Sequence, residues 1–299
     1  MADLFANLHS TVRTLNATSL AIETTGRNLA NINNTNYARQ QVLYDSKGLD
    51  AIGIEQLRDT LLDRKVMREV SLSSAYSAEQ AACQRAQASL GETISSSTAA
   101  AATDATSNTG LSAAIDDFFT GFQALAASPT GVGERQTLIQ RAGVLTDKLQ
   151  LADQRLSQVE ADLDTQIGID VTTANSLLSS VAKLNDLIAK LELNNPGSAT
   201  DLRDQRQGKL EELAAKLPVT VGECPDGQMQ LRLPDDSGAS VVLVDGNIVT
   251  GPVALTGAGL TGGAGPATLA LTAGSIQGAL NARDGALRPL RDNLDLLTR

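Results

Sequence analysis

The stretch LIQRAGVLTDKLQLADQRLSQVEADL, residues 138–163, carries the clearest pattern in the chain. Its apolar side chains recur at alternating steps of four and three residues, at Leu138, Ala142, Leu145, Leu149, Ala152, Leu156, Val159 and Leu163. This spacing predicts an α-helix with one continuous apolar face that packs along a partner. Two steps of four then follow, through Ile167 to Val171, and such a stutter locally unwinds a supercoil. We expect a single helix over about residues 134–194, on the order of 80–90 Å long, which is typical of a rod-like helical domain.

A second apolar repeat lies at the N-terminus, where residues 4–32 predict another helix. Every seventh residue is apolar, at Leu8, Leu15, Ile22 and Leu29. A seven-residue repeat keeps a narrow seam facing a partner helix. The partner is either another chain or another part of an internal bundle, and periodicity alone favours neither.

Asparagine-rich residues 31–36 are expected to end this helix in a capped turn, because asparagine tolerates left-handed backbone and hydrogen-bonds its own main chain. A short extended piece is predicted at 41–44.

Three more helices are expected before residue 218. The first runs from about Gly53 to Ile94 and loses its pattern in the Ser/Thr/Ala tract 95–109, and the second covers 111–127. Ser198–Asp201 resembles a capping box that opens a third helix to Leu217.

The composition changes after residue 218, where glycine and proline become frequent. Short alternating stretches near Met229–Leu233 and Val241–Leu243 predict antiparallel strands. From about Ser275 the helical pattern returns, and its apolar face reaches Arg299 without a cap, so we expect the helix to continue beyond the chain.

These patterns predict a mainly α chain: a long helical coiled-coil or bundle rod domain, a small antiparallel β insertion domain and an N-terminal heptad helix. The expected division is an N-terminal helix and turn over residues 1–48, a rod domain over 49–217 completed by 274–299, and a β-rich inserted domain over 218–273.

Composition excludes several classes of function. The 299 residues carry 24 Lys and Arg against 34 Asp and Glu, a net charge of −10, which disfavours nucleic-acid binding. No apolar run approaches the roughly 18 residues of a membrane helix. The single histidine, His9, and two distant cysteines, Cys83 and Cys224, make no zinc pattern, and we expect both thiols to be unpaired.

No catalytic or cofactor site is expected. GAGLTG at 257–262 matches G-x-G-x-x-G, but further glycines and a proline follow, so no helix starts there to receive a phosphate. The adjacent carboxylates of Asp116 and Asp117 point about 100° apart on a helix. No nucleophile, base and orienting group can be assembled, and we predict no enzyme, no metal and no cofactor.

Residues 28–40, NLANINNTNYARQ, resemble the N-terminal signature of the bacterial flagellar axial proteins (rod, hook and hook-associated proteins), which is close to N-I-A-N-x-N-T-P-G-Y-x-R-Q after a heptad helix. The matching residues are Asn28, Ala30, Asn31, Asn33, Tyr37, Arg39 and Gln40. The chain departs at Leu29, Asn34, Thr35 and Asn36. Because asparagine often replaces glycine in left-handed backbone, Asn36 is expected to preserve the turn.

Further stretches resemble one branch, the hook-associated protein 1 family. They are DDFFTGFQAL at 116–125, which includes Phe118 and Phe119, the helix start Arg135-Gln136 before Leu138, and the segment around Asp204, Gln205 and Arg206. Arg283 and Asp284 fit the returning helix of that family.

This resemblance implies a structural subunit at the junction between flagellar hook and filament, whose N- and C-terminal helices pair inside a tube. It implies that the heptad and signature residues mediate assembly. The implied partners are further copies in a ring or tube, the hook protein and hook-associated protein 3, with no nucleic acid and no membrane. The implied location is the extracellular flagellum, reached by type III export without a cleaved signal peptide. The family chain continues past Arg299, so the pairing C-terminal helix and a chaperone-binding region are expected outside this chain.

Two alternatives remain at this point. Another axial protein, from the hook or distal rod, would share the N-terminal signature but lack the long helix over 134–194. A cytoplasmic signalling coiled coil would require a paired N-terminal helix in the isolated chain.

Overall fold

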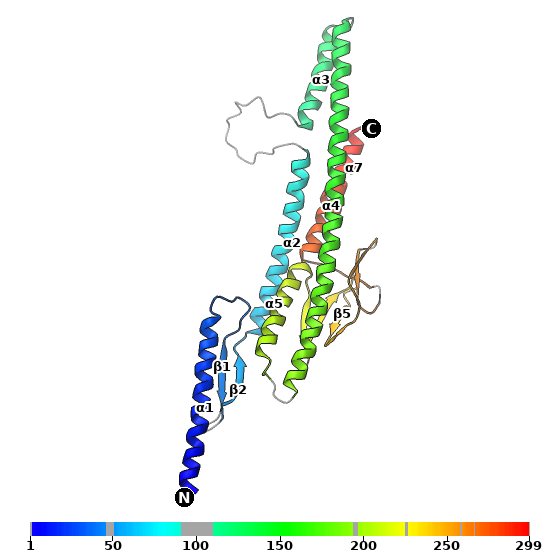
Figure 1. Ribbon diagram of the computed structural model, residues 1–299. Helices are drawn as coiled ribbons and strands as arrows, with labels where there is room; N and C mark the ends of the chain where they lie inside the picture. Colours follow the sequence, from blue (N-terminus) through cyan, green and yellow to red (C-terminus); the bar gives the residue numbers. More distant parts are fainter. Residues whose placement is uncertain are drawn as a thin grey trace. The chain divides into compact units, whose positions relative to one another are not determined.

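The computed structural model (Figure 1) describes residues 2–45, 51–90, 110–193, 197–224, 227–257, 259–265 and 267–298. Its contacts form two compact units, which we call the first unit (Met1–Ser74 with Asp170–Gly274) and the second unit (Ala75–Ile169 with Ser275–Arg299). The three-part division expected from the sequence places its boundaries elsewhere and stays a prediction.

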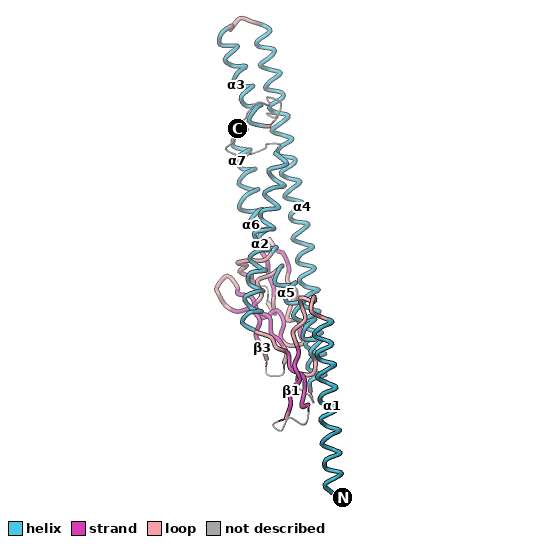
Figure 2. Tube along the Cα trace, turned by 90° about the vertical axis from the view of Figure 1, so that its left-hand side faces the viewer, coloured by secondary structure: helices cyan, strands magenta, loops and turns pink. Residues whose placement is uncertain are grey.

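The first unit begins with α1 (Ala2–Ala30), the antiparallel hairpin of β1 (Gln40–Tyr44) and β2 (Ala51–Gln56), and the start of α2 (Thr60–Leu90). It continues with the last part of α4 (Val132–Glu192) and with α5 (Thr200–Lys216). One antiparallel sheet holds, in spatial order, β3 (Thr220–Glu223), β4 (Met229–Pro234), β5 (Ser240–Asp245) and β6 (Ile248–Val249). A second holds β7 (Ala254–Thr256), β8 (Gly259–Gly262) and β9 (Ala267–Thr268). Within the described residues all strands belong to this unit, and Figure 2 draws them in magenta.

The second unit holds the rest of α2, then α3 (Leu111–Ala127) and the first part of α4. It is completed by α6 (Ser275–Asn281), a π-helical segment η1 (Ala282–Leu287) and α7 (Arg288–Thr298). Proline lacks an N–H and disrupts the α-helical bonding of the preceding turn. The π-helical segment lies in the turns that precede Pro289, where this effect is expected.

The expected fold class is confirmed: the chain is mainly α, with a long helix, small antiparallel sheets and an N-terminal helix. The helix α4 is continuous over 61 residues. Its predicted apolar seam is buried from Ala152 to Val181, apart from the half-buried Val159, and is half-buried from Leu138 to Leu149.

The second helix was predicted to start too early. Residues 51–56 form β2, where Val42 pairs with Ile54 and Gln41 with Glu55. The helix α2 starts only at Thr60, because the Asp59 carboxylate accepts the N–H groups of Leu61 and Leu62 at 2.9 and 3.2 Å. The predicted end at Ile94 and the tract 95–109 lie outside the described residues.

The predicted capping box at Ser198–Asp201 is wrong. The N-cap of α5 is Ala199, with no side-chain cap of its own. The carboxylate of Glu192, at the end of α4, instead accepts the Ala199 N–H at 3.1 Å. A carboxylate that accepts a free N–H at a helix start stabilises the helix, whichever segment of the chain supplies the carboxylate.

The left-handed asparagine conformation expected at 31–36 is also wrong. Among the described residues, positive φ angles occur only at glycines. The turn is instead closed by side chains: the Asn31 amide donates to the Arg27 carbonyl at 3.0 Å, and the Asn34 side-chain oxygen accepts the Asn36 N–H at 3.2 Å.

Candidate assembly site

The helix α1 has two faces with opposite environments. Ala17 and Thr24 are buried on the face that packs on the β1–β2 hairpin. The heptad seam lies on another face and is open to solvent, with exposed fractions of 58, 67, 69 and 70% at Leu8, Leu15, Ile22 and Leu29. No described residue covers this seam, which is the exposure that a helix awaiting a partner would show.

Asn28 fixes the turn after α1. Its side-chain oxygen accepts the Tyr37 hydroxyl and the Gln40 N–H, both at 2.9 Å, and its amide donates to the Gln40 carbonyl at 2.8 Å. Burial and the nearby carboxylate of Asp204 raise the pKa of Tyr37, which keeps the phenol a hydrogen-bond donor. One helical side chain therefore ties the start of β1 to α1, and this tie explains why asparagine is needed at position 28.

The other signature residues contribute unequally. Gln40 is 2% exposed, and neither polar atom of its side-chain amide has a partner among the described residues. Asn33 and Arg39 are exposed, and the Arg39 carbonyl accepts the Leu57 N–H at 2.8 Å across the hairpin. Asn33 and the Arg39 side chain therefore face solvent, where a partner can reach them.

Two motifs that lie more than 160 residues apart in sequence meet in the first unit. The Asp204 carboxylate of α5 accepts the Ala38 N–H at 3.2 Å and pairs with Arg58 at 3.1 Å. Arg58 in turn donates to the Asn36 carbonyl at 3.1 Å. Burial raises the pKa of Asp204, and the Ala38 N–H and Arg58 oppose that shift. The signature turn is thereby held against α5.

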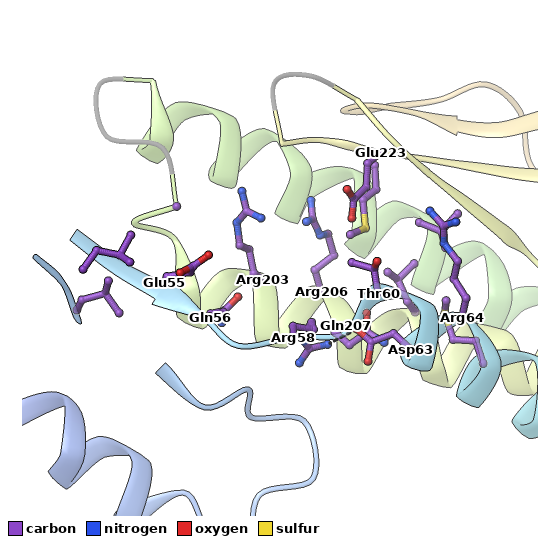
Figure 3. Close-up of a pocket in the computed structure, with 17 residues that line it drawn as sticks. Glu55, Gln56, Arg58, Thr60, Asp63, Arg64, Arg203, Arg206, Gln207 and Glu223 are labelled. Carbon is purple, nitrogen blue, oxygen red and sulfur yellow. Dashed lines mark hydrogen bonds and ion pairs between the residues drawn. The ribbon is translucent and has the colours of Figure 1, made fainter. Parts of the chain in front are cut away.

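Arg206, two residues after Asp204, connects α5 to α4 and to the sheet that holds β3 to β6. Arg206 is 2% exposed and donates to the Asn185 side-chain oxygen at 2.8 Å and to the Gly227 carbonyl at 2.9 Å. The Asn185 amide donates to the Met229 and Gly246 carbonyls at 2.8 and 2.7 Å. Figure 3 shows Arg203 and Arg206 pointing from α5 toward Glu223. Gln205, between them in sequence, is exposed.

Glu192, the last residue of α4, makes a further contact with α5. It accepts two hydrogen bonds from Arg203, at 2.8 and 2.6 Å. Although burial raises the pKa of Glu192, the hydrogen bonds and charge of Arg203 outweigh it and hold that pKa below its usual value.

The remaining motif residues lie in the second unit. The ring of Phe118 makes edge-on contacts with Phe119 and Phe122, at centroid distances of 5.8 and 4.9 Å. Phe119 and Phe122 are themselves exposed, so the described residues cover only part of this aromatic cluster. Arg135 donates twice to the Pro129 carbonyl, at 3.2 and 2.7 Å, and holds the α3–α4 loop. Gln136 is exposed.

Sequence reasoning missed Asn185 and Asp170. Asn185 follows Leu178 and Val181 on the apolar seam of α4 and, although polar, is as fully buried as they are. Asp170 is buried and pairs with Lys216 at 2.9 Å. A polar residue at a seam position was the available signal for Asn185, because a buried polar group requires a partner.

The described residues offer no metal cluster of three or more His, Cys, Asp or Glu side chains. Among the same residues, no helix is long and apolar enough to cross a membrane. Both cysteines are free thiols, as expected. The stretch matching G-x-G-x-x-G contributes β8 rather than the start of a helix.

Comparison with known proteins identifies the family. Residues 100–299 match the family described as flagellar hook-associated protein FlgK helical domain. The chain belongs to this family. The long helix α4 and the family match together exclude the hook or distal-rod alternative and the signalling coiled coil.

Individual relatives of the FlgK family extend the similarity toward the N-terminus. Flagellar hook-associated protein 1 of Bacillus subtilis is 23% identical over 270 residues, covering 83% of this chain and 50% of that protein. The Salmonella typhimurium protein of the same name is 25% identical over 232 residues, covering 73% of this chain and 39% of that protein. This chain thus spans half or less of the length of these relatives.

A solved structure agrees with this assignment. The flagellar hook junction protein FlgK from Burkholderia pseudomallei matches with a TM-score of 0.57 and 25% identity, over 78% of this chain and 40% of that one.

Proposed function

We propose that this chain is part of a non-enzymatic structural subunit of the bacterial flagellum, located at the junction of hook and filament. Its place would be extracellular, after export without a cleaved signal peptide. Its neighbours would be further copies of itself in a ring or tube, the hook protein and hook-associated protein 3, and an export chaperone would bind it before assembly. The names of its relatives and the exposed heptad seam support this proposal.

The observation that carries the proposal is the exposure of Leu8, Leu15, Ile22 and Leu29 along one face of α1. Full burial of a leucine or isoleucine side chain contributes about 1.5–3 kcal/mol. A seam with this spacing therefore favours pairing with another helix, and the same small gain repeats at each copy in a tubular assembly.

The signature turn supports the proposal in a different way. Asn28 ties the turn to α1 and the Asp204–Arg58 pair holds it against α5, while Asn33 and Arg39 are exposed and Asn31 is half-buried. We infer that the turn sets the direction of α1 relative to the β1–β2 hairpin, and that Tyr37 and Gln40 serve this positioning. Phe118, Arg135 and Gln136 would support the helical part from the second unit.

The test is a charge placed on the seam. In the intact gene product, Leu15→Asp is expected to abolish filament attachment and motility while leaving the helical content of the purified protein unchanged. The matched control is Asn16→Asp, which adds the same charge at the next, exposed position outside the seven-residue repeat.

We expect the control cells to remain motile. Motile filaments in the Leu15→Asp strain would overturn the proposal, as would equal loss of motility in both strains.

A further inference from the structure

A cavity of about 510 Å³ in the first unit is lined by the β1–β2 hairpin, the start of α2, α5, β3 and the first residue of β4. Its volume lies within the range of roughly 300–1,000 Å³ that holds small ligands. Figure 3 shows Arg203 and Arg206 pointing the same way from α5, Glu223 next to the end of Arg206, and Thr60 and Arg64 on α2. The family resemblance and the assembly proposal leave this cavity without a role.

Arg206 is the unusual group in this cavity. Its guanidinium is almost fully buried, yet the acceptors it contacts are two neutral oxygens, of Asn185 and Gly227. Its Nε is buried and has no partner among the described residues. Burial lowers the pKa of Arg206 to about 10, so the group is still a cation at neutral pH. The charges of Glu192 and Glu223 act on Arg206, but its hydrogen-bond acceptors are both neutral. A carboxylate that reached the guanidinium would offset part of the cost of burying this cation.

The other arginines of the cavity separate into two kinds. Arg58 pairs with Asp63 and Asp204, and Arg203 pairs with Glu192. Arg64 is exposed and has no hydrogen bond or ion pair in the described part of the chain. Arg64 and Arg206 are therefore the cations left to receive a ligand.

Acidic residues at the cavity limit the charge of that ligand. Glu223 and Glu55 line it and are exposed, and the Glu55 carboxylate accepts a hydrogen bond from Gln41 at 3.2 Å. Both carboxylates would repel a doubly charged phosphate. A single carboxylate is planar, accepts guanidinium N–H groups and carries one charge.

We propose that this cavity binds a carboxylate group, with the guanidinium of Arg206 supplying one cation and Arg64 supplying a second at the entrance. The carboxylate comes either from a small molecule in solution or from an acidic side chain of a second copy of this chain, which carries 34 Asp and Glu residues. Glu223 competes with the ligand and sets its affinity.

The probe is N-acetylglutamate α-amide, which presents one side-chain carboxylate, with the uncharged N-acetylglutamine α-amide as its control. The readout is the NMR signal of each arginine Nε–H group in the ¹⁵N-labelled chain. We expect the acid to shift the Arg206 signal in a saturable way and the amide to leave it unchanged.

Variants test the assignment without removing Arg206, whose loss could unfold the unit. Arg64→Gln is expected to weaken binding about fivefold and Glu223→Gln to strengthen it about threefold, as rim charges do. The matched control Arg68→Gln removes an exposed arginine of the same helix outside the cavity, and it should leave the affinity unchanged.

A dilution series without the probe distinguishes the two possible sources of the carboxylate. An Arg206 signal that moves with protein concentration, and no longer does so when the probe is saturating, assigns the carboxylate to a second copy. A signal independent of concentration but moved by the probe assigns it to a small molecule. A signal that moves in neither series, or equally with acid and amide, overturns the proposal, and so does equal weakening by Arg64→Gln and Arg68→Gln.

Discussion

The apolar seams of α1 and α4 have similar sequence patterns and opposite environments. Leu163, Leu178 and Val181 of α4 are buried, whereas Leu8, Leu15 and Ile22 of α1 are exposed. Both seams satisfy the spacing that brings one helix face to a partner. An apolar repeat therefore predicts a seam, whereas the location of the partner, in the same chain or in another, depends on the rest of the fold.

The largest expected effect compares the two seams directly. Leu178→Ala removes a fully buried side chain and should lower the free energy of unfolding by about 2–5 kcal/mol. Leu15→Ala, with the same change at an exposed position, should alter it by less than about 0.5 kcal/mol. Urea denaturation of the isolated chain measures both. Equal losses would mean that the α1 seam is already packed in the chain.

A smaller effect concerns how α1 is held. Asn28→Ala removes acceptors from Tyr37 and Gln40 and should cost about 1–3 kcal/mol in the local stability of the hairpin contact. Amide hydrogen exchange of residues 17–44 should accelerate, with no change in α4. The control Asn33→Ala, at an exposed signature position, should leave exchange unchanged. Unchanged exchange in Asn28→Ala would contradict the role assigned to this side chain.

The helix α4 should also contribute a pH-dependent stability through Glu160. Hydrogen bonds from Arg288 and Arg291 outweigh burial and hold the pKa of Glu160 below its usual value. A lowered pKa stabilises the folded state above the unfolded glutamate pKa of about 4.3, and this contribution disappears as the pH falls through the folded pKa.

Glu160→Gln should therefore cost about 1 kcal/mol at pH 7 and progressively less as the pH falls below about 4.3. Asp162→Asn removes an exposed carboxylate of the same helix, which only accepts a hydrogen bond from Gln158, and serves as the control. A Glu160→Gln effect that is constant with pH would show that the ion pairs with α7 do not form.

The smallest effect is expected on α1 itself. Glu23 and Arg27 pair at 2.8 Å, one turn apart and both exposed. Glu23→Gln should change stability by no more than about 0.5 kcal/mol. A larger loss, measured by urea denaturation, would show that this face of α1 is covered in the isolated chain.

The elements that repeat over long stretches could be predicted from the sequence. The helix α4 and its seam followed from an unbroken spacing, and α3 was predicted at its observed bounds. Only the first strand of the β1–β2 hairpin was predicted. The second was missed because residues 51–56 are a short segment that becomes a strand only through pairing with β1. The cap of α5 was misassigned because the capping carboxylate belongs to Glu192 of the preceding helix α4. A local sequence pattern does not reveal a contact between two helices.

The candidate site also has features that the sequence predicted and features that it did not. The signature residues were found as a pattern, but their docking on Asp204 could not be predicted, since more than 160 residues separate the partners. Asn185 was missed because its role depends on strands that arrive from later in the chain. Long-range polar contacts leave only an indirect trace in sequence, as a polar residue at an apolar position.

The most direct test of the assembly claim is solvent access to the α1 seam before and after assembly. Leu15→Cys and, as control, Ser157→Cys on the exposed side of α4 are introduced with Cys83→Ser and Cys224→Ser, so that each protein carries one reporter thiol. Maleimide labelling is followed in the isolated chain and in hook–filament junctions of the intact gene product. We predict that the Leu15→Cys thiol is labelled as fast as the control in the isolated chain and at least about tenfold more slowly in junctions, as burial at an interface requires. Equal labelling of the Leu15→Cys thiol in both states would contradict the claim that the seam is an assembly interface.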